Sequence, residues 1–291
     1  MKTLKIPFLI LALAVSAGLS GHAALAETKS SDRPNRIVSI GGSLTEIVFA
    51  LGEDSRLIAR DTTSTFPATA SLLPDVGYIR ALSPEGVLSV DPKLVIALEG
   101  AGPPEAVSVL KAADVPFISI PETFSRSGII EKILAVGDAL NSQTAAKNLA
   151  NKVDRELAEV EALTSNLKTR KKVMFILSAR GGKILAAGRN TSAEAIIRMA
   201  GGINAVVGYN GYKPLTAEAI ITAAPDVILM MQRGGNHAAD NSTLKKHAAL
   251  SATPAVMNSN IIRMNALYLL GFGPRTASAI RELSTKLYGS N

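Results

Sequence analysis

Short apolar runs alternate with stretches of helical periodicity along most of the chain. In the first half, continuous apolar runs predict strands at residues 37–40, 57–60, 94–98 and 117–120. Apolar residues spaced three or four apart predict helices at 44–51, 104–113, 127–140 and 143–167. Strands that alternate with helices in this way are typical of a parallel sheet with crossover helices.

The same alternation resumes after the helical run that ends at Leu167. Further strands are predicted at 173–177, 227–231 and 261–264, and further helices at 191–200, 217–224 and 274–287. The run from 143 to 167 would form a helix about 35 Å long. We therefore expect two α/β lobes, at residues 27–141 and 170–291, with a long helix between them at 142–169.

One segment of the chain occurs twice. Leu82–Ile96 aligns without a gap with Leu215–Leu229, which lies 133 residues further on. In each copy a hydroxyl residue, Ser83 or Thr216, can cap a short helix, and a proline precedes the apolar strand that follows. A repeat this widely spaced indicates two similar lobes, and it favours a binding site where they face each other.

Each copy of the repeat carries one glutamate in the first turn of its predicted helix. These residues are Glu85 and Glu218. A carboxylate at this position is stabilised by the helix dipole, which is one explanation for both of them. The alternative is that two symmetric acidic points dock onto basic pockets of a symmetric partner.

The first 26 residues have the features of an export signal. Lys2 and Lys5 precede an apolar run at 6–15, and Ala24–Ala26 fits the small-residue pattern of a signal peptidase site. The apolar run is too short to span a bilayer, which makes a membrane anchor the weaker interpretation. We expect cleavage near Ala26 and a mature protein in the periplasm.

Composition excludes several kinds of function. The chain has no cysteine, so disulfides, thiolate metal sites and cysteine nucleophiles are absent. The net charge is +7, which is compatible with an anionic small ligand. The basic residues do not form a Lys/Arg run interleaved with aromatic residues, which argues against binding to nucleic acid.

His237 and His247 lack metal-ligand spacing, and no nucleophile motif is present, so we predict that the protein is not an enzyme. Gly41–Ser43 lacks both phosphate-loop spacings, which favours a tight turn over a phosphate site.

Tyr78 is the main candidate for chemistry, because aromatic residues make up only 4% of the chain. A phenolate is a hard oxygen ligand that suits ferric iron. The nearby cation of Arg80 would favour the deprotonated phenol, and in an extended chain residues 78 and 80 point to the same side. The alternative is a loop tyrosine that packs on the surface beside an arginine.

The second lobe offers a comparable group of aromatic and basic residues. Tyr209, Tyr212 and Lys213 lie just before the second copy of the repeat, and we expect them to face Tyr78 from the opposite wall. Arg180 and Arg233 each follow a predicted strand and precede two glycines. They are candidates to meet an acidic ligand, or they flank ordinary turns.

At these residues the sequence resembles the haem-binding periplasmic proteins of bacterial ABC haem importers, a group within the class III periplasmic binding proteins that also bind cobalamin and ferric siderophores. The likeness covers essentially the whole chain after the signal. Its most specific segments are Val38–Glu46, Asp75–Arg80, Leu185–Thr191 and Leu269–Thr276.

The resemblance implies two Rossmann-like lobes bridged by one long helix, with ferric haem as the transported ligand in the cleft between them. It implies that Tyr78 is the axial iron ligand, that Arg80 supports it, and that Glu85 and Glu218 meet arginines of a dimeric permease in the inner membrane. It also implies a monomer and an outer-membrane haem receptor system upstream. Met230, Met231 and Leu269 are candidates for the apolar walls of the cleft.

The sequence departs from that family in one loop. Some relatives carry a histidine after the first strand of the second lobe and stack two haems, whereas this chain has Ser178–Gly182 without one. This argues for a single haem, with Arg180 either pairing with a propionate or facing the iron's open side. The alternative ligands are a ferric siderophore or cobalamin.

Overall fold

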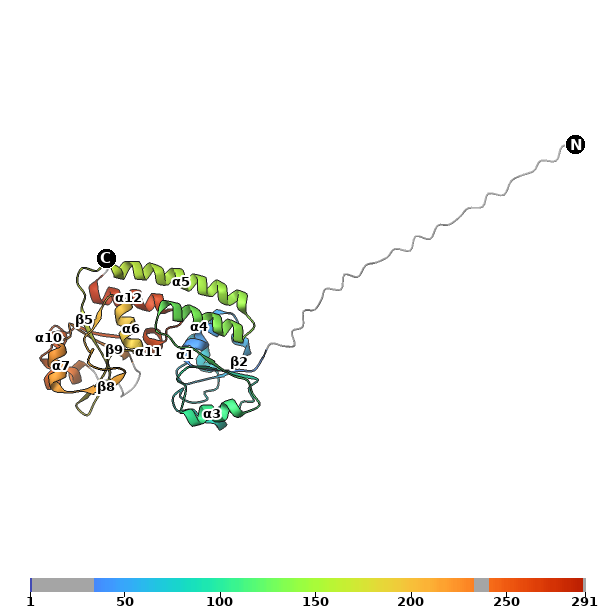
Figure 1. Ribbon diagram of the computed structural model, residues 1–291, viewed down its shortest axis with the longest axis horizontal. Helices are drawn as coiled ribbons and strands as arrows, with labels where there is room; N and C mark the ends of the chain where they lie inside the picture. Colours follow the sequence, from blue (N-terminus) through green and yellow to red (C-terminus); the bar gives the residue numbers. More distant parts are fainter. Residues whose placement is uncertain (2–33, 233–240, 290–291) are drawn as a thin grey trace. The chain divides into compact units, whose positions relative to one another are not determined.

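The computed structural model describes Met1 and residues 34–232 and 241–289. The chain divides into a unit of residues 1–32 and a compact unit of residues 33–291, and both sheets belong to the second unit. Apart from Met1, the predicted export signal lies outside the described residues. Figure 1 shows an α/β fold in which two sheets are flanked by helices.

Sheet A is formed by the first half of the chain and is entirely parallel, with the strand order β2–β1–β3–β4. Its strands are β1 (Ile37–Ile40), β2 (Leu57–Arg60), β3 (Leu94–Leu98) and β4 (Phe117–Ile120). These bounds are the predicted ones. Strands β1 and β3 are apolar along almost their whole length because helices cover both faces of the sheet.

The helices of the first lobe form a layer on each side of sheet A. They are α1 (Gly42–Ala50), α2 (Pro84–Leu88), α3 (Pro104–Ala112) and α4 (Arg126–Ala139), with short 3-10 helices η2 (Asp54–Arg56) and η3 (Ala68–Leu72). Buried residues of α1 and α4 pack on one face, and those of α2 and α3 pack on the other. The lobe is therefore a three-layer α/β/α unit.

Sheet B is formed by the second half of the chain and is mixed. Its strands are β5 (Lys172–Arg180), β6 (Lys183–Ala187), β7 (Ile203–Asn204), β8 (Tyr212–Leu215), β9 (Val227–Gln232) and β10 (Ile261–Asn265). The order β7–β5–β9–β10 is parallel and repeats the order β2–β1–β3–β4 of sheet A. The repeat predicted from sequence thus corresponds to α2 and β3 in one lobe and to α7 (Ala217–Ala223) and β9 in the other.

Strands β6 and β8 depart from the expected parallel sheet. Both pair antiparallel, β6 with the second half of β5 and β8 with β6. The cause lies in the turn after β5, where Gly181 and Gly182 have φ angles of 55° and 71°. Two consecutive residues in the left-handed region form a tight hairpin turn, so the chain returns beside β5 instead of crossing over through a helix.

The remaining helices cover both faces of sheet B. They are α6 (Ser192–Met199), α8 (Asn241–Lys246), α9 (Ala248–Ser251), α10 (Pro254–Met257), α11 (Ala266–Leu270) and α12 (Thr276–Tyr288). Buried residues of α6, α11 and α12 share a core with one face of the sheet, and those of α7 to α10 pack against the other.

The long helix α5 (Gln143–Ser165) occupies the predicted position between the two sheets in the chain. It contacts α4 of the first lobe and α12 of the second (Figure 1). Its buried residues, from Ala146 to Val160, recur at helical spacing and belong to one core that includes residues of both lobes. No helix in the described ranges combines the length and the apolar character that crossing a membrane requires.

Buried polar contacts connect the two lobes. Lys132 on α4 has a side chain with no exposed surface, and its Nζ lies 2.6 Å from Glu122 Oε1 and 3.1 Å from the carbonyl oxygen of Phe272. Glu46 on α1 accepts from the Arg275 Nη2 at 2.8 Å and from the Arg275 backbone N–H at 3.2 Å. These contacts join α1 and α4 to the segment between α11 and α12.

Candidate functional site

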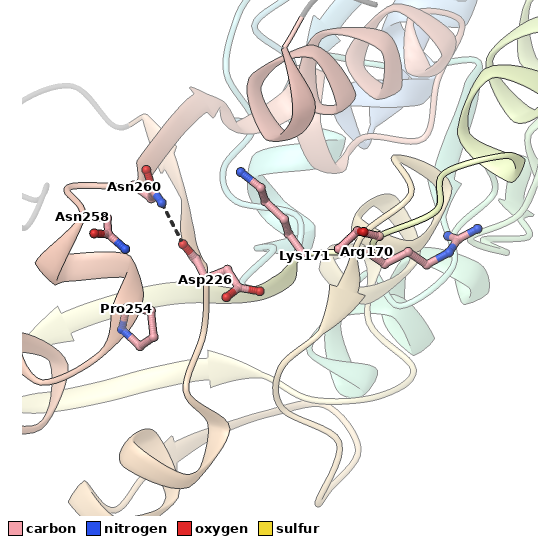
Figure 2. Close-up of a pocket in the computed structure, with 7 residues that line it drawn as sticks. Arg170, Lys171, Asp226, Pro254, Asn258 and Asn260 are labelled. Carbon is pink, nitrogen blue, oxygen red and sulfur yellow. Dashed lines mark hydrogen bonds between the residues drawn. The ribbon is translucent and has the colours of Figure 1, made fainter.

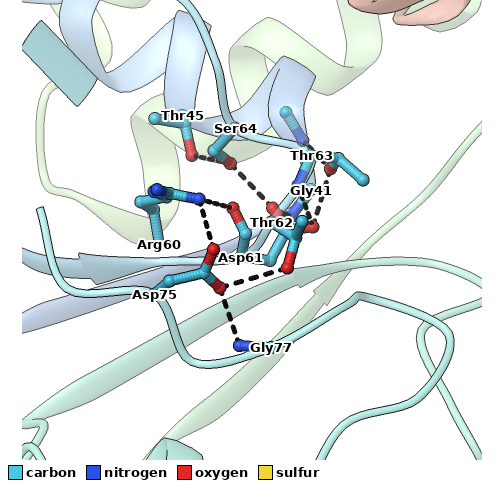
Figure 3. Close-up of polar contacts among 10 residues, drawn as sticks. Gly41, Thr45, Arg60, Asp61, Thr62, Thr63, Ser64, Asp75 and Gly77 are labelled. Atoms are coloured by element: carbon cyan, nitrogen blue, oxygen red, sulfur yellow. Dashed lines mark hydrogen bonds and ion pairs between the residues drawn. The ribbon is translucent and has the colours of Figure 1, made fainter. Parts of the chain in front are cut away.

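The turn after β1 lies at the carboxyl edge of sheet A, the edge where open parallel sheets bind ligands. The Gly41 backbone N–H donates to Asp61 Oδ1 at 2.9 Å (Figure 3). The Gly42 N–H donates to Thr63 Oγ1 at 3.1 Å. The amides that a phosphate would need are therefore already bonded to side chains of the loop after β2. The turn is shorter than the one predicted at Gly41–Ser43, because α1 already begins at Gly42.

Asp61 is the centre of this arrangement, and sequence reasoning did not single it out. The fully buried carboxylate also accepts from the Thr63 backbone N–H at 3.0 Å and from Ser64 Oγ at 2.7 Å. Gly42 has no room for a side chain, since an added Cβ would lie 2.5 Å from Leu267 Cδ1 of the other lobe. Asp61 thus fixes two loops at the edge where the lobes meet.

A second carboxylate positions the loop that carries Tyr78. Asp75 accepts from Arg60 Nη1 at 2.7 Å, from Thr62 Oγ1 at 3.1 Å and from the Gly77 backbone N–H at 2.9 Å (Figure 3). The Thr62 N–H in turn donates to the Gly77 carbonyl oxygen at 2.9 Å. The backbone before Tyr78 is therefore held against the loop that follows β2.

Tyr78 itself is open to solvent, with 47% of its surface exposed. Its backbone carbonyl accepts from the Ala81 N–H at 2.7 Å, so residues 78–81 form a turn. The extended geometry that would place side chains 78 and 80 on one side does not apply here. Within the described ranges, neither Tyr78 nor Arg80 makes a side-chain hydrogen bond or ion pair.

The Arg80 side chain lies close to the loop that follows β3, because a Cβ atom added at Gly100 of that loop would be 3.8 Å from Arg80 Nη1. Burial raises the pKa of the nearby Glu122 carboxyl, while the positive charges of Lys132 and, more weakly, of Arg80 act in the opposite direction. Arg80 therefore brings a positive charge to the carboxyl edge of the sheet, on the loop that also carries Tyr78.

The aromatic and basic residues of the second lobe do not form one wall. The Tyr209 hydroxyl donates to the carbonyl oxygens of Ala186 at 2.9 Å and Lys213 at 3.2 Å, and the Lys213 ammonium lies 5.6 Å from the Tyr209 ring centroid. Burial raises the pKa of the Tyr209 phenol. Tyr212 packs instead against the core on the other face of sheet B, with its ring 6.3 Å from that of Phe175.

The other cations and histidines of the second lobe have different positions. Arg180 is the last residue of β5 and flanks the hairpin turn. Arg233 and His237 lie outside the described residues. His247 is a helix cap, because its Nδ1 accepts from the Leu250 N–H at 3.3 Å at the start of α9. Of the expected apolar wall residues, Met230 and Leu269 are buried in the cores of the second lobe, and Met231 is partly buried against one of these cores.

The two glutamates of the repeat are both exposed, at equivalent places in α2 and α7. Ser83 and Thr216 cap these helices as predicted, by accepting from the backbone N–H groups of Gly86 and Ala219. The Ser83 hydroxyl also donates to Glu85 Oε2 at 2.7 Å, and this bond holds the pKa of the Glu85 carboxyl below its usual value.

A surface cavity of about 280 Å³ lies away from all of these residues. It is lined by residues that include Arg170, Lys171, Asp226, Pro254, Asn258 and Asn260 (Figure 2). These residues precede β5, β9 and β10, so the cavity lies at the amino ends of these strands, whereas open parallel sheets bind ligands at the carboxyl ends. Asp226 bonds to neighbouring loops: its backbone carbonyl accepts from Asn260 Nδ2, and its carboxylate accepts from the Lys172 backbone N–H.

No group of three or more potential metal ligands from His, Cys, Asp and Glu occurs in the parts that the structure covers.

Comparisons with known proteins relate the chain to extracytoplasmic transport proteins. The family model described as "Periplasmic binding protein" matches residues 37–267. The structure of the periplasmic heme-binding protein BhuT in complex with two hemes has 38% sequence identity and a TM-score of 0.82, covering 87% of this chain and 97% of that one. The apo periplasmic heme-binding protein RhuT from Roseiflexus sp. RS-1 has 38% identity and a TM-score of 0.84, covering 88% and 98%.

A curated relative has a different ligand in its name. The vitamin B12-binding protein of Vibrio parahaemolyticus is 26% identical over 259 residues, which are 88% of this chain and 90% of that protein. The proteins of this family bind substrates for ABC transporters and are not enzymes. With the matched region running from β1 to α11, the chain belongs to the periplasmic binding protein family.

Proposed function

We propose that the protein captures ferric haem and delivers it to an ABC permease of the inner membrane. In this proposal residues 1–26 direct export, and the mature protein works in the periplasm as a monomer. The observation that carries it is the solvent-exposed phenol of Tyr78, which has no partner within the described residues and lies with Arg80 at the ligand-binding edge of sheet A.

The chemistry of these two residues fits an iron porphyrin. Tyrosinate is a known haem ligand, and ferric iron favours the deprotonated phenol. The Arg80 guanidinium on the same loop adds positive charge that can meet a propionate of the porphyrin. The likeness to two solved periplasmic heme-binding proteins at 38% identity supports the same ligand class.

The vitamin B12-binding relatives make cobalamin the second candidate, and titration separates the two. Haem added to the purified protein is expected to saturate it and to give a high-spin ferric-tyrosinate spectrum. Aquocobalamin and a ferric siderophore, titrated in parallel, are expected to leave tyrosine absorption and protein fluorescence unchanged. Saturable binding of cobalamin without binding of haem would contradict the proposal.

The same titration gives the stoichiometry. BhuT was solved with two hemes. Here the loop after β5 is a tight hairpin turn through Gly181 and Gly182 and has no histidine. We expect an equivalence point at one haem per protein.

Glu85 and Glu218 are proposed as docking points for the permease. Replacing either by alanine is expected to lower haem-dependent ATPase activity of the permease about threefold to tenfold at limiting binding protein, because one steering charge is lost. Haem affinity should not change. Glu105→Ala is the matched control, since Glu105 is also an exposed first-turn glutamate, on α3, but lies outside the repeat. Equal effects of all three substitutions would contradict specific docking.

A further inference from the structure

The two most exposed aromatic side chains among the described residues lie on neighbouring loops. They are Tyr78, with 47% of its surface exposed, and Phe66, with 38% exposed. Both belong to the segment that leads from β2 to α2. The loops are joined by the hydrogen bond from the Thr62 N–H to the Gly77 carbonyl oxygen, 2.9 Å long. Exposed aromatic rings are thus concentrated at the edge of sheet A where a ligand is expected.

Phe66 is held in place from one side. The guanidinium carbon of Arg275 lies 3.4 Å from the centroid of the Phe66 ring, which is a stacking distance. Arg275 is itself fixed by two hydrogen bonds to the buried carboxylate of Glu46. The cation that supports the ring is therefore anchored in the junction between the lobes.

The stack does not account for the surface that Phe66 leaves exposed. Arg275 already forms a salt bridge with Glu46, so its positive charge is balanced without the Phe66 ring. One face of the ring is covered by the guanidinium, so the exposed part of the side chain lies away from Arg275. Leu72, with 84% of its surface exposed, lies on the same segment between Phe66 and Tyr78. An exposed ring that stacks on a cation, on a loop hydrogen-bonded to the loop of Tyr78, is suited to a ligand that is flat and apolar around a central metal.

We propose that Phe66 is a second ligand contact, whose ring packs against the flat apolar part of a porphyrin while Tyr78 binds its iron. This inference rests on the proposed function and adds a residue that selects for the macrocycle independently of the metal. A porphyrin offers aromatic surface to a phenyl ring, whereas a corrin is partly saturated and carries many amide side chains. Phe66 therefore favours a porphyrin over cobalamin.

Metal-free protoporphyrin IX separates the two contacts, because it has the macrocycle but no iron for Tyr78. We expect Phe66→Ala to weaken binding of both haem and metal-free protoporphyrin IX about tenfold. Tyr78→Phe should weaken the binding of haem and leave that of the metal-free porphyrin within about twofold. Fluorescence quenching of the porphyrin and absorption titration of haem measure the two affinities.

Two controls keep the result interpretable. Leu163→Ala removes a side chain that is 57% exposed on α5 and should change neither affinity. Phe66→Tyr keeps the ring and should restore binding, while Phe66→Leu keeps apolar surface without the ring and serves if the alanine variant does not fold. Unchanged affinities for both ligands in folded Phe66→Ala or Phe66→Leu would overturn the inference. In that case, a tyrosinate spectrum of the haem complex would leave the proposed function standing, whereas a wild-type protein that binds no haem would overturn the function itself.

Discussion

Replacing Lys132 by methionine is expected to lower the free energy of unfolding by about 3–5 kcal/mol. The Lys132 side chain has no exposed surface, and its ammonium is 2.6 Å from the Glu122 carboxylate. Burial lowers the pKa of Lys132 and raises that of Glu122, and the attraction between the two charges opposes both shifts. Without the ammonium, the carboxylate would be left largely buried without its partner, and the Phe272 carbonyl would lose a donor. Urea denaturation at pH 7 measures the loss.

A second substitution identifies the cause of this loss. Glu122→Gln in the Lys132→Met background removes the uncompensated charge and is expected to restore about 2 kcal/mol. Lys152→Met is the control for removing a lysine, because Lys152 pairs with Glu156 at 4.0 Å on the exposed side of α5. That variant should stay within about 0.5 kcal/mol of wild type. If Lys132→Met were no more destabilising than this control, the junction would not depend on the buried pair.

The parallel cores of both lobes could be predicted closely from the sequence. Strands β1 to β4 were predicted with the bounds they have. The central strands β1 and β3 are almost entirely apolar because helices cover both faces of the sheet, whereas the edge strands β2 and β4 are only partly buried. The repeat was visible because each copy keeps a capping hydroxyl, a first-turn glutamate and a proline before the strand. These are local signals.

Other features depend on contacts between distant residues and have no local signal. Glu46 and Arg275 are 229 positions apart, and Lys132 and Phe272 are 140 apart. Strand β8 was missed because it is short and contains Pro214, which an edge strand tolerates because one side of its backbone needs no partner. Asp61 could not be singled out, because its role depends on a turn 20 residues earlier.

The tyrosines show where the sequence was ambiguous. Tyr209 and Tyr212 were expected to share a wall because they are close in sequence. They pack instead against the cores on opposite faces of sheet B. Their separation by three positions could have suggested this, since alternate residues of an extended chain point to opposite sides. Of the tyrosines proposed for the site, Tyr78 is the one that the fold leaves exposed.

Tyr78→Phe is expected to weaken the binding of ferric haem about 100-fold, which corresponds to about 2.7 kcal/mol. Phenylalanine keeps the ring and removes only the oxygen, so the macrocycle can still bind while the iron loses its protein ligand. The tyrosinate vibrations in the resonance Raman spectrum of the haem complex should disappear. Because the Tyr78 side chain makes no hydrogen bond within the described residues, stability should stay within about 0.5 kcal/mol of wild type.

Tyr209→Phe is the matched control, since it removes the same atom from a phenol that is bonded to two backbone carbonyls. It should cost about 1 kcal/mol of stability and leave haem affinity and the tyrosinate spectrum unchanged. Tyr78→Phe should therefore change haem affinity but not stability, whereas Tyr209→Phe should change stability but not haem affinity. A tyrosinate spectrum that persists in Tyr78→Phe and disappears in Tyr209→Phe would assign the iron to the second lobe, and would require the bonds that now hold the Tyr209 hydroxyl to break when haem binds.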